Sequence, residues 1–71
     1  MQIKLKDIYM PIIDSMANSK FKCTFYQYDK SGRLVLMTEL YNYSLCLLYV
    51  SNIKIEFVNT YYLIEFHLKG E

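Results

Sequence analysis

Residues 21–40 read FKCTFYQY, then DKSG, then RLVLMTEL, and this stretch decides the fold. From Phe21 to Tyr28 the side chains alternate between two faces, which is typical of a half-buried strand. Leu34, Leu36 and Leu40 then share one face of a second strand. Gly32 supplies the positive φ that a tight turn between them needs. The stretch therefore predicts a β-hairpin.

The segment before the hairpin has helical periodicity. Apolar residues recur there at the i, i+3, i+4 spacing of one helical face, at Leu5, Ile8, Tyr9, Ile12, Ile13 and Met16. Two starting points fit the sequence: Asp7 as the N-cap, or a start near Met10 with Pro11 in the first helical position. Asn18 and Ser19 are expected to end the helix.

The segment after the hairpin predicts further strands. Residues 53–57 and 62–68 alternate apolar and polar side chains on either side of an Asn59-Thr60 turn. Residues 43–50 are apolar on both faces, so a central strand and a buried helix both fit them. The predicted fold is α+β, an N-terminal amphipathic helix packed on a four- to five-stranded antiparallel meander sheet, forming a single small domain over residues 1–71.

The composition limits what this domain can do. A chain of 71 residues buries only about 60% of its unfolded surface, so association with another chain is a plausible way to bury more. The formal net charge is +1 and only one residue is arginine, whereas nucleic-acid-binding domains usually concentrate more positive charge. The start of the chain is charged and its longest apolar run, Leu45–Val50, is too short to span a bilayer, so we expect a cytoplasmic protein without membrane contact.

Sites for catalysis, metals and cofactors are weakly supported. His67 shares a strand face with Glu65 and Lys69, but no nucleophile stands beside it, and the sequence predicts no enzyme. Cys23 and Cys46 lack the spacing of zinc ligands and are expected to be buried free thiols. The only glycines, Gly32 and Gly70, are too few for a phosphate-binding loop. We therefore expect no metal and no cofactor.

Eight tyrosines are the unusual feature of the sequence. Tyrosine gives large, rigid contact area and tolerates exposure, which favours a non-enzymatic module that binds another protein and occludes it, as a homodimer. The abundance of residues with AT-rich codons fits a phage or mobile-element accessory protein or inhibitor. The expected partner-binding residues are Tyr26, Tyr28, Tyr41, Tyr43, Tyr49 and Tyr61.

The alternative function is nucleic-acid binding. Aromatic side chains on a sheet face, flanked by cations, stack on unpaired bases in several small β domains. The first hairpin strand and its turn carry such a combination. The residues of this alternative site are Lys20, Lys22, Tyr26, Tyr28, Lys30 and Arg33.

Overall fold

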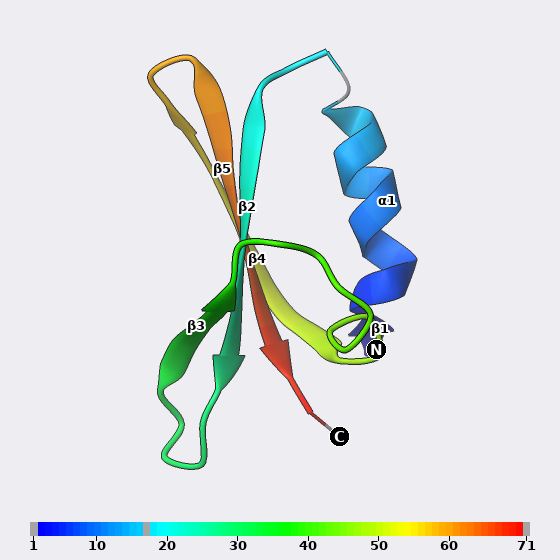
Figure 1. The fold of residues 1–71 in the computed structure, drawn as a ribbon, viewed down its shortest axis with the longest axis vertical. Helices are drawn as coiled ribbons and strands as arrows, with labels where there is room; N and C mark the ends of the chain where they lie inside the picture. The colour runs from blue at the N-terminus through cyan, green and yellow to red at the C-terminus, as the bar shows by residue number, and fades with distance from the viewer. Residues whose placement is uncertain (1, 17, 71) are drawn as a thin grey trace.

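The computed structural model describes residues 2–16 and 18–70, which form one helix packed against a five-stranded sheet (Figure 1). The α+β class and the N-terminal position of the helix are confirmed. The strand order is β1-β4-β5-β2-β3. The elements are β1 (Ile3–Lys4), α1 (Leu5–Ser15), β2 (Phe21–Tyr28), β3 (Leu34–Thr38), β4 (Tyr49–Val58) and β5 (Tyr61–Lys69).

The sheet is mixed, so the predicted antiparallel meander is wrong. The β2–β3 and β4–β5 hairpins are antiparallel, as expected. β5, however, lies between β4 and β2, and it runs parallel to β2 from the pair Phe21 and Tyr62 to the pair Gln27 and Leu68. The alternation of side chains reports which face of a strand is buried, but it does not report which strand lies beside it.

Residues 43–48 form neither the central strand nor the helix that their apolar pattern allowed. They turn in front of the first turn of α1, and β4 begins only at Tyr49 (Figure 1). Leu45 and Cys46 are buried there. The carbonyls of Leu48 and Cys46 accept hydrogen bonds from Leu5 N (2.9 Å) and Lys6 N (3.0 Å). We call residues 43–48 the lid, because they cover the core at the N-terminal end of the helix.

These contacts also explain where α1 begins. Both predicted starts, at Asp7 and near Met10, are too late, because the helix begins at Leu5. Lys4 occupies the N-cap position without a side-chain hydrogen bond, and the carbonyls of residues 46 and 48 satisfy the first amide groups instead. Pro11 consequently lies in the helix interior. The helix ends at Ser15, before the predicted Asn18 and Ser19.

The core lies between α1 and the face of the sheet that it covers. Phe25 of β2 stacks on Phe66 of β5 with 5.3 Å between ring centroids, and Tyr9 of α1 lies 6.0 Å from both rings. Cys23 lies in this core as a free thiol, and burial raises its pKa. The buried residues of the core cluster are Leu5, Cys23, Phe25, Leu45, Ile64, Phe66 and Leu68.

Asp29 organises the turn of the β2–β3 hairpin. Its Oδ1 accepts hydrogen bonds from Ser31 Oγ (2.7 Å), Ser31 N (2.9 Å) and Arg33 N (2.9 Å). Gly32 follows with φ +84°, in the left-handed region that glycine adopts without strain. The aspartate and the glycine therefore fix the connection that the sequence predicted.

The Asp29 turn predicts a pH dependence. The hydrogen bonds from the Ser31 side chain and then from the Arg33 amide lower the pKa of Asp29 below its ordinary value. Because the folded pKa is the lower one, this stabilisation is complete above the unfolded pKa of about 3.9 and is lost as the pH falls further. We expect urea unfolding to show a smaller loss of stability below pH 4 in an Asp29→Asn variant than in the parent. Asp14→Asn, at an exposed helix position, is the control, and an unchanged acid limb in Asp29→Asn contradicts the prediction.

Candidate functional site: the outer face of the sheet

The sheet face that α1 does not cover carries a small aromatic and aliphatic surface on the β2–β3 hairpin. The register places Tyr26 opposite Leu36 and Tyr28 opposite Leu34. Tyr26 and Tyr28 alternate with the core residues of β2, so they point away from the helix. The leucines opposite them on β3 share this face of the sheet. Leu36 is 51% exposed and Tyr28 is 42% exposed. We call Tyr26, Tyr28, Leu34 and Leu36 the outer hairpin patch.

Ion pairs border the outer hairpin patch. Lys22 Nζ lies 3.0 Å from Glu39 Oε1, and the hydrogen bond and charge of Glu39 raise the pKa of Lys22. Across the sheet, Lys54 Nζ lies 3.0 Å from Glu56 Oε1 on β4. Leu63, Val58 and Tyr61 also lie on the outer face but are only partly exposed, so the patch holds the most exposed apolar side chains of this face.

His67 and Glu65 occupy the outer face as the alternation of β5 predicted. His67 Nε2 lies 3.1 Å from Glu65 Oε1, and the imidazole meets the Tyr26 ring edge-on at 5.7 Å between centroids. Such a pair can orient a proton-accepting imidazole. Cys23 points into the core on the opposite face, and Cys46 is buried in the lid, where its thiol donates to Tyr43 O at 2.9 Å. The structure thus brings neither thiol to His67.

The six predicted partner-binding tyrosines do not form one surface. Four lie on the outer face, at Tyr26, Tyr28, Tyr49 and Tyr61. The other two lie in the connection between β3 and β4, on the side of the helix. There Tyr41 stacks on Tyr9 with 4.0 Å between centroids, and Tyr43 is 88% exposed. Among the six, the structure brings only Tyr26 and Tyr28 together with other exposed apolar side chains on the outer face.

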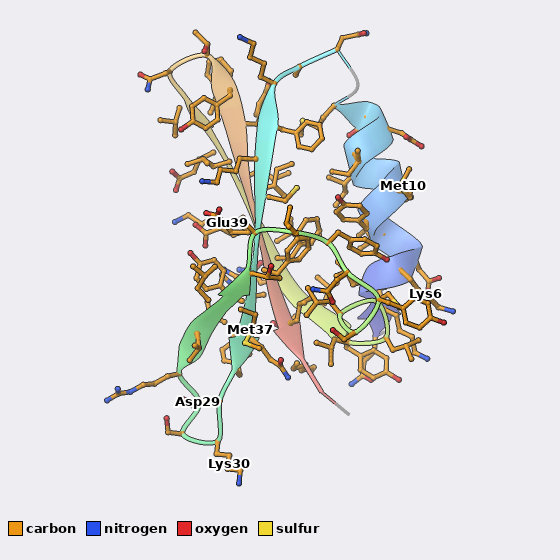
Figure 2. All side chains as sticks on the ribbon, in the orientation of Figure 1. Lys6, Met10, Asp29, Lys30, Met37 and Glu39 are labelled. Atoms are coloured by element: carbon orange, nitrogen blue, oxygen red, sulfur yellow. The ribbon has the colours of Figure 1, made fainter. Side chains whose placement is uncertain are left out.

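The cations of the alternative nucleic-acid site are separated along β2. Lys20 and Lys22 lie at the start of the strand, whereas Arg33 lies beside the turn at its other end. Lys30 lies in that turn (Figure 2). Eight strand residues span about 26 Å. Lys22 is paired with Glu39, so one of the four cations is partly neutralised.

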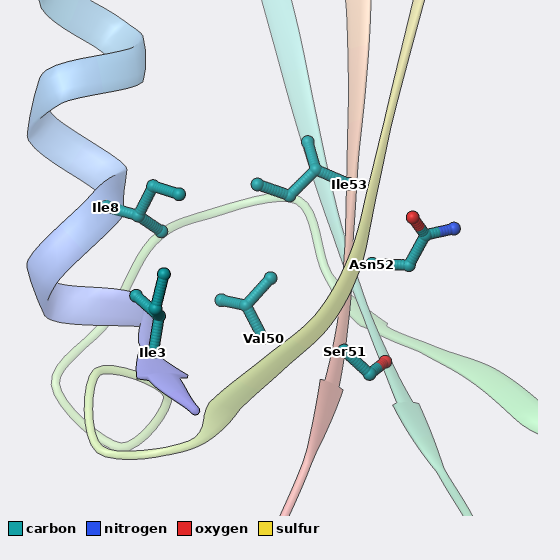
Figure 3. A pocket seen from close by; sticks show the side chains of 6 residues that line it. All are labelled: Ile3, Ile8, Val50, Ser51, Asn52 and Ile53. Carbon is teal, nitrogen blue, oxygen red and sulfur yellow. The ribbon is translucent and has the colours of Figure 1, made fainter. Parts of the chain in front are cut away.

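Two hollows lie on the helix side of the molecule. A groove of about 230 Å³ runs between α1 and β4 (Figure 3), and its lining residues are Ile3, Ile8, Val50, Ser51, Asn52 and Ile53. A second hollow, of about 480 Å³, lies between the lid and the start of α1, and its lining residues are Lys6, Tyr41, Asn42, Tyr43, Cys46 and Leu47. Within residues 2–16 and 18–70, no three His, Cys, Asp or Glu side chains group as metal ligands.

Sequence reasoning missed the groove and the exposed strand beside it. The accessible surface of the structure is 5,078 Å², whereas the scaling for compact proteins gives about 4,700 Å² for this mass. Part of this surface is on β4, where Ile55 and Phe57 are exposed on the helix side. Their alternation was visible in the sequence, but the sequence did not show that α1 leaves them uncovered.

No protein-family model, curated protein or solved structure matches the chain. Across the part of the chain that the structure describes, no helix has the length and apolar character needed to cross a membrane.

Proposed function

We propose that this protein is a small non-enzymatic module that binds another protein through the outer hairpin patch. The observation that supports this most directly is the exposure of Leu36 and Tyr28 beside Leu34 and Tyr26 on one sheet face. Apolar surface of this kind is stabilised by burial against a partner. Tyrosine rings supply rigid contact area, and the neighbouring charges form the polar rim that such interfaces have.

Binding at this patch acts by occlusion. The patch lies on the paired strands β2 and β3, so the module presents a fixed shape and loses little conformational freedom on docking. No rearrangement of the core is needed, because Tyr26 and Leu36 already point outward. An accessory protein or inhibitor of a phage or other mobile element could use such a platform to cover a functional surface of a larger protein.

The nucleic-acid alternative has one supporting observation, the shared outer face of Tyr26, Tyr28 and Lys22. The pairing of Lys22 with Glu39 and the distance between the two ends of β2 favour the protein-binding proposal instead. The two functions differ in salt dependence, because contacts to phosphates release counterions and weaken steeply as salt rises.

Site-specific photo-crosslinking tests the proposal. A photoreactive amino acid replaces Tyr28 or Leu36 in one pair of chains, and replaces Met10, an exposed apolar residue on α1, in the control chain. We expect a protein adduct in cells of the source organism from positions 28 and 36 and none from position 10. The crosslinked partner is then purified, and Leu36→Ser is expected to weaken its binding at least about tenfold, whereas Met10→Ser leaves it unchanged.

Two results overturn the proposal. Equal crosslinking from positions 10 and 36 removes the outer hairpin patch as the binding surface. Adducts that nuclease treatment digests, together with binding that falls steeply with salt, support the nucleic-acid alternative instead.

A further inference from the structure

The outer edge of β4 is open over most of its length. β1 pairs with β4 only at Tyr49 and Val50, and no other described residue pairs with this edge. A regular stretch from Asn52 to Val58 is therefore free, because the β-bulge between Val50 and Asn52 lies before it. A long strand edge with unpaired amide and carbonyl groups is a template for another strand.

The direction of these backbone groups follows from the hairpin register. The two-residue Asn59-Thr60 turn closes on the pair Val58 and Tyr61, which is a hydrogen-bonded pair in such hairpins. Hydrogen-bonded and non-hydrogen-bonded pairs alternate along an antiparallel ladder. The amide and carbonyl groups of the odd-numbered residues Ile53, Ile55 and Phe57 consequently face the open edge.

We propose that a second copy of this chain occupies the edge, with the two β4 strands antiparallel about a two-fold axis at Ile55. Ile55 then lies opposite its own copy, and Ile53 lies opposite Phe57 of the other chain. All of these residues have backbone groups directed at the edge, so three pairs exchange hydrogen bonds. On the helix side the same pairs form a continuous apolar row.

Charge selects this register over its neighbours. On the outer face it places each Lys54 opposite Glu56 of the other chain, in the closer, non-hydrogen-bonded type of pair. Sliding one strand by two residues places Lys54 opposite Lys54, or Glu56 opposite Glu56, and like charges in direct opposition are destabilising. Sliding it by one residue moves the apolar row of one copy to the opposite face.

In this register, the groove between α1 and β4 receives the Phe57 ring of the other copy. Ile3, Ile8, Val50 and Ile53 point into the space between helix and strand, whereas Ser51 and Asn52 point to the other side (Figure 3). Phe57, which is 63% exposed, is placed by the two-fold axis opposite Ile53 of the other copy, at the mouth of this groove. Dimerisation therefore covers the exposed Phe57 and the groove in one step.

β3, the strand at the opposite edge of the sheet, is a poorer candidate. It has only five residues, and its register shifts at Met37, opposite the step from Phe25 to Tyr26. Bulges of this kind interrupt the regular edge that an added strand requires. β4 offers the longer uninterrupted edge.

The dimer has one consequence for the proposed function, namely the spacing of two outer hairpin patches. This consequence rests on the proposal that the patch binds a partner. A two-fold axis perpendicular to the sheet keeps both outer hairpin patches on the same side. Six strand spacings of about 4.8 Å, or roughly 29 Å, separate the two patches across the sheet, and the axis at Ile55 also offsets them by roughly 26 Å along the strands, so their centres lie about 40 Å apart. A partner with two matching surfaces at that spacing gains avidity from the second contact.

Charge-reversal variants test the dimer through analytical ultracentrifugation over a concentration series. Lys54→Glu and Glu56→Lys each place two like-charged pairs across the axis, and each alone is expected to raise the dimer dissociation constant at least about tenfold. An equimolar mixture of the two variants restores opposite charges at every pair, so it should form a heterodimer about as tightly as the parent forms a homodimer. The ion pair within each chain remains broken in that mixture, so its repair cannot explain the rescue.

Mild oxidation of variants that add one edge cysteine to the two buried thiols supplies a second readout. Ile55→Cys places two thiols opposite each other at a Cα separation of about 5.5 Å, which a disulfide can bridge. Ile53→Cys is the matched control, because residue 53 lies opposite residue 57. We expect a covalent dimer from the first variant and not from the second. A parent that stays monomeric at all concentrations, or a mixture of charge variants without rescue, overturns the dimer; crosslinking at the outer hairpin patch then still reports separately on partner binding.

Discussion

Phe66→Ala is expected to lower the free energy of unfolding by about 3–5 kcal/mol, the range for removing a fully buried phenylalanine side chain. Phe66 has no exposed surface, stacks on Phe25 at 5.3 Å, and lies opposite Ile53 on β4. The ring thus connects the two hairpins at the one parallel pairing in the sheet. A domain of this size has little stability in reserve, so we expect most of the variant to be unfolded at 25 °C. Circular dichroism and amide proton spectra measure this directly.

Phe57→Ala is the matched control for Phe66→Ala. It removes the same atoms from the neighbouring strand, but the ring is 63% exposed. Both variants are compared at concentrations low enough to keep the chain monomeric, since Phe57 also lies in the proposed dimer contact. The monomer is expected to lose less than about 1 kcal/mol. Equal losses in the two variants would show that the core does not lie where the structure places it.

The elements that local patterns specify were predictable from the sequence. The β2–β3 hairpin follows from a period of two on both sides of Asp29–Gly32, and the structure confirms it. The register of that hairpin was not predictable in the same way. The hydrogen bond from Asp29 N to Arg33 O leads to the pairs that bring Leu34 and Leu36 beside the tyrosines, on the face away from the helix. Sequence reasoning could place Tyr26 and Tyr28 outward but did not join the leucines to them.

The strand order depends on a connection that carries no periodic signal. Residues 39–48 lead the chain from β3 at one edge of the sheet to β4 on the other side of β5, past the start of α1 (Figure 1). Leu45 and Cys46 are apolar because they cover the core as part of this lid. A strand and a lid can have the same apolar composition, so the pattern alone left residues 43–50 undecided. The same crossing leaves one edge of β4 open, so the sequence predicted a homodimer but not the strand edge through which we propose that it forms.

Pro11 is a second consequence of the early helix start, and its replacement is expected to stabilise the protein. One of the two helix starts that fit the sequence placed Pro11 at the first helical position, where its missing amide hydrogen costs nothing. Because the lid carbonyls fix the start at Leu5, Pro11 instead lies seven residues into α1. A proline there cannot donate to the carbonyl of Asp7, and its ring crowds that carbonyl.

Pro11→Ala restores the missing helical hydrogen bond and replaces the least favourable helix residue with the most favourable one. We expect the free energy of unfolding to rise by about 1–3 kcal/mol, since Pro11 is exposed and its ring contributes little to the core. Urea titration monitored at the helical circular dichroism band measures the change. Asp14→Ala, on the same helix, is the control and should shift stability by less than about 0.5 kcal/mol. If Pro11→Ala leaves stability unchanged or lowers it, residues 5–10 are not held in the helix by the lid, and the helix begins near the proline, as one of the two predicted starts had it.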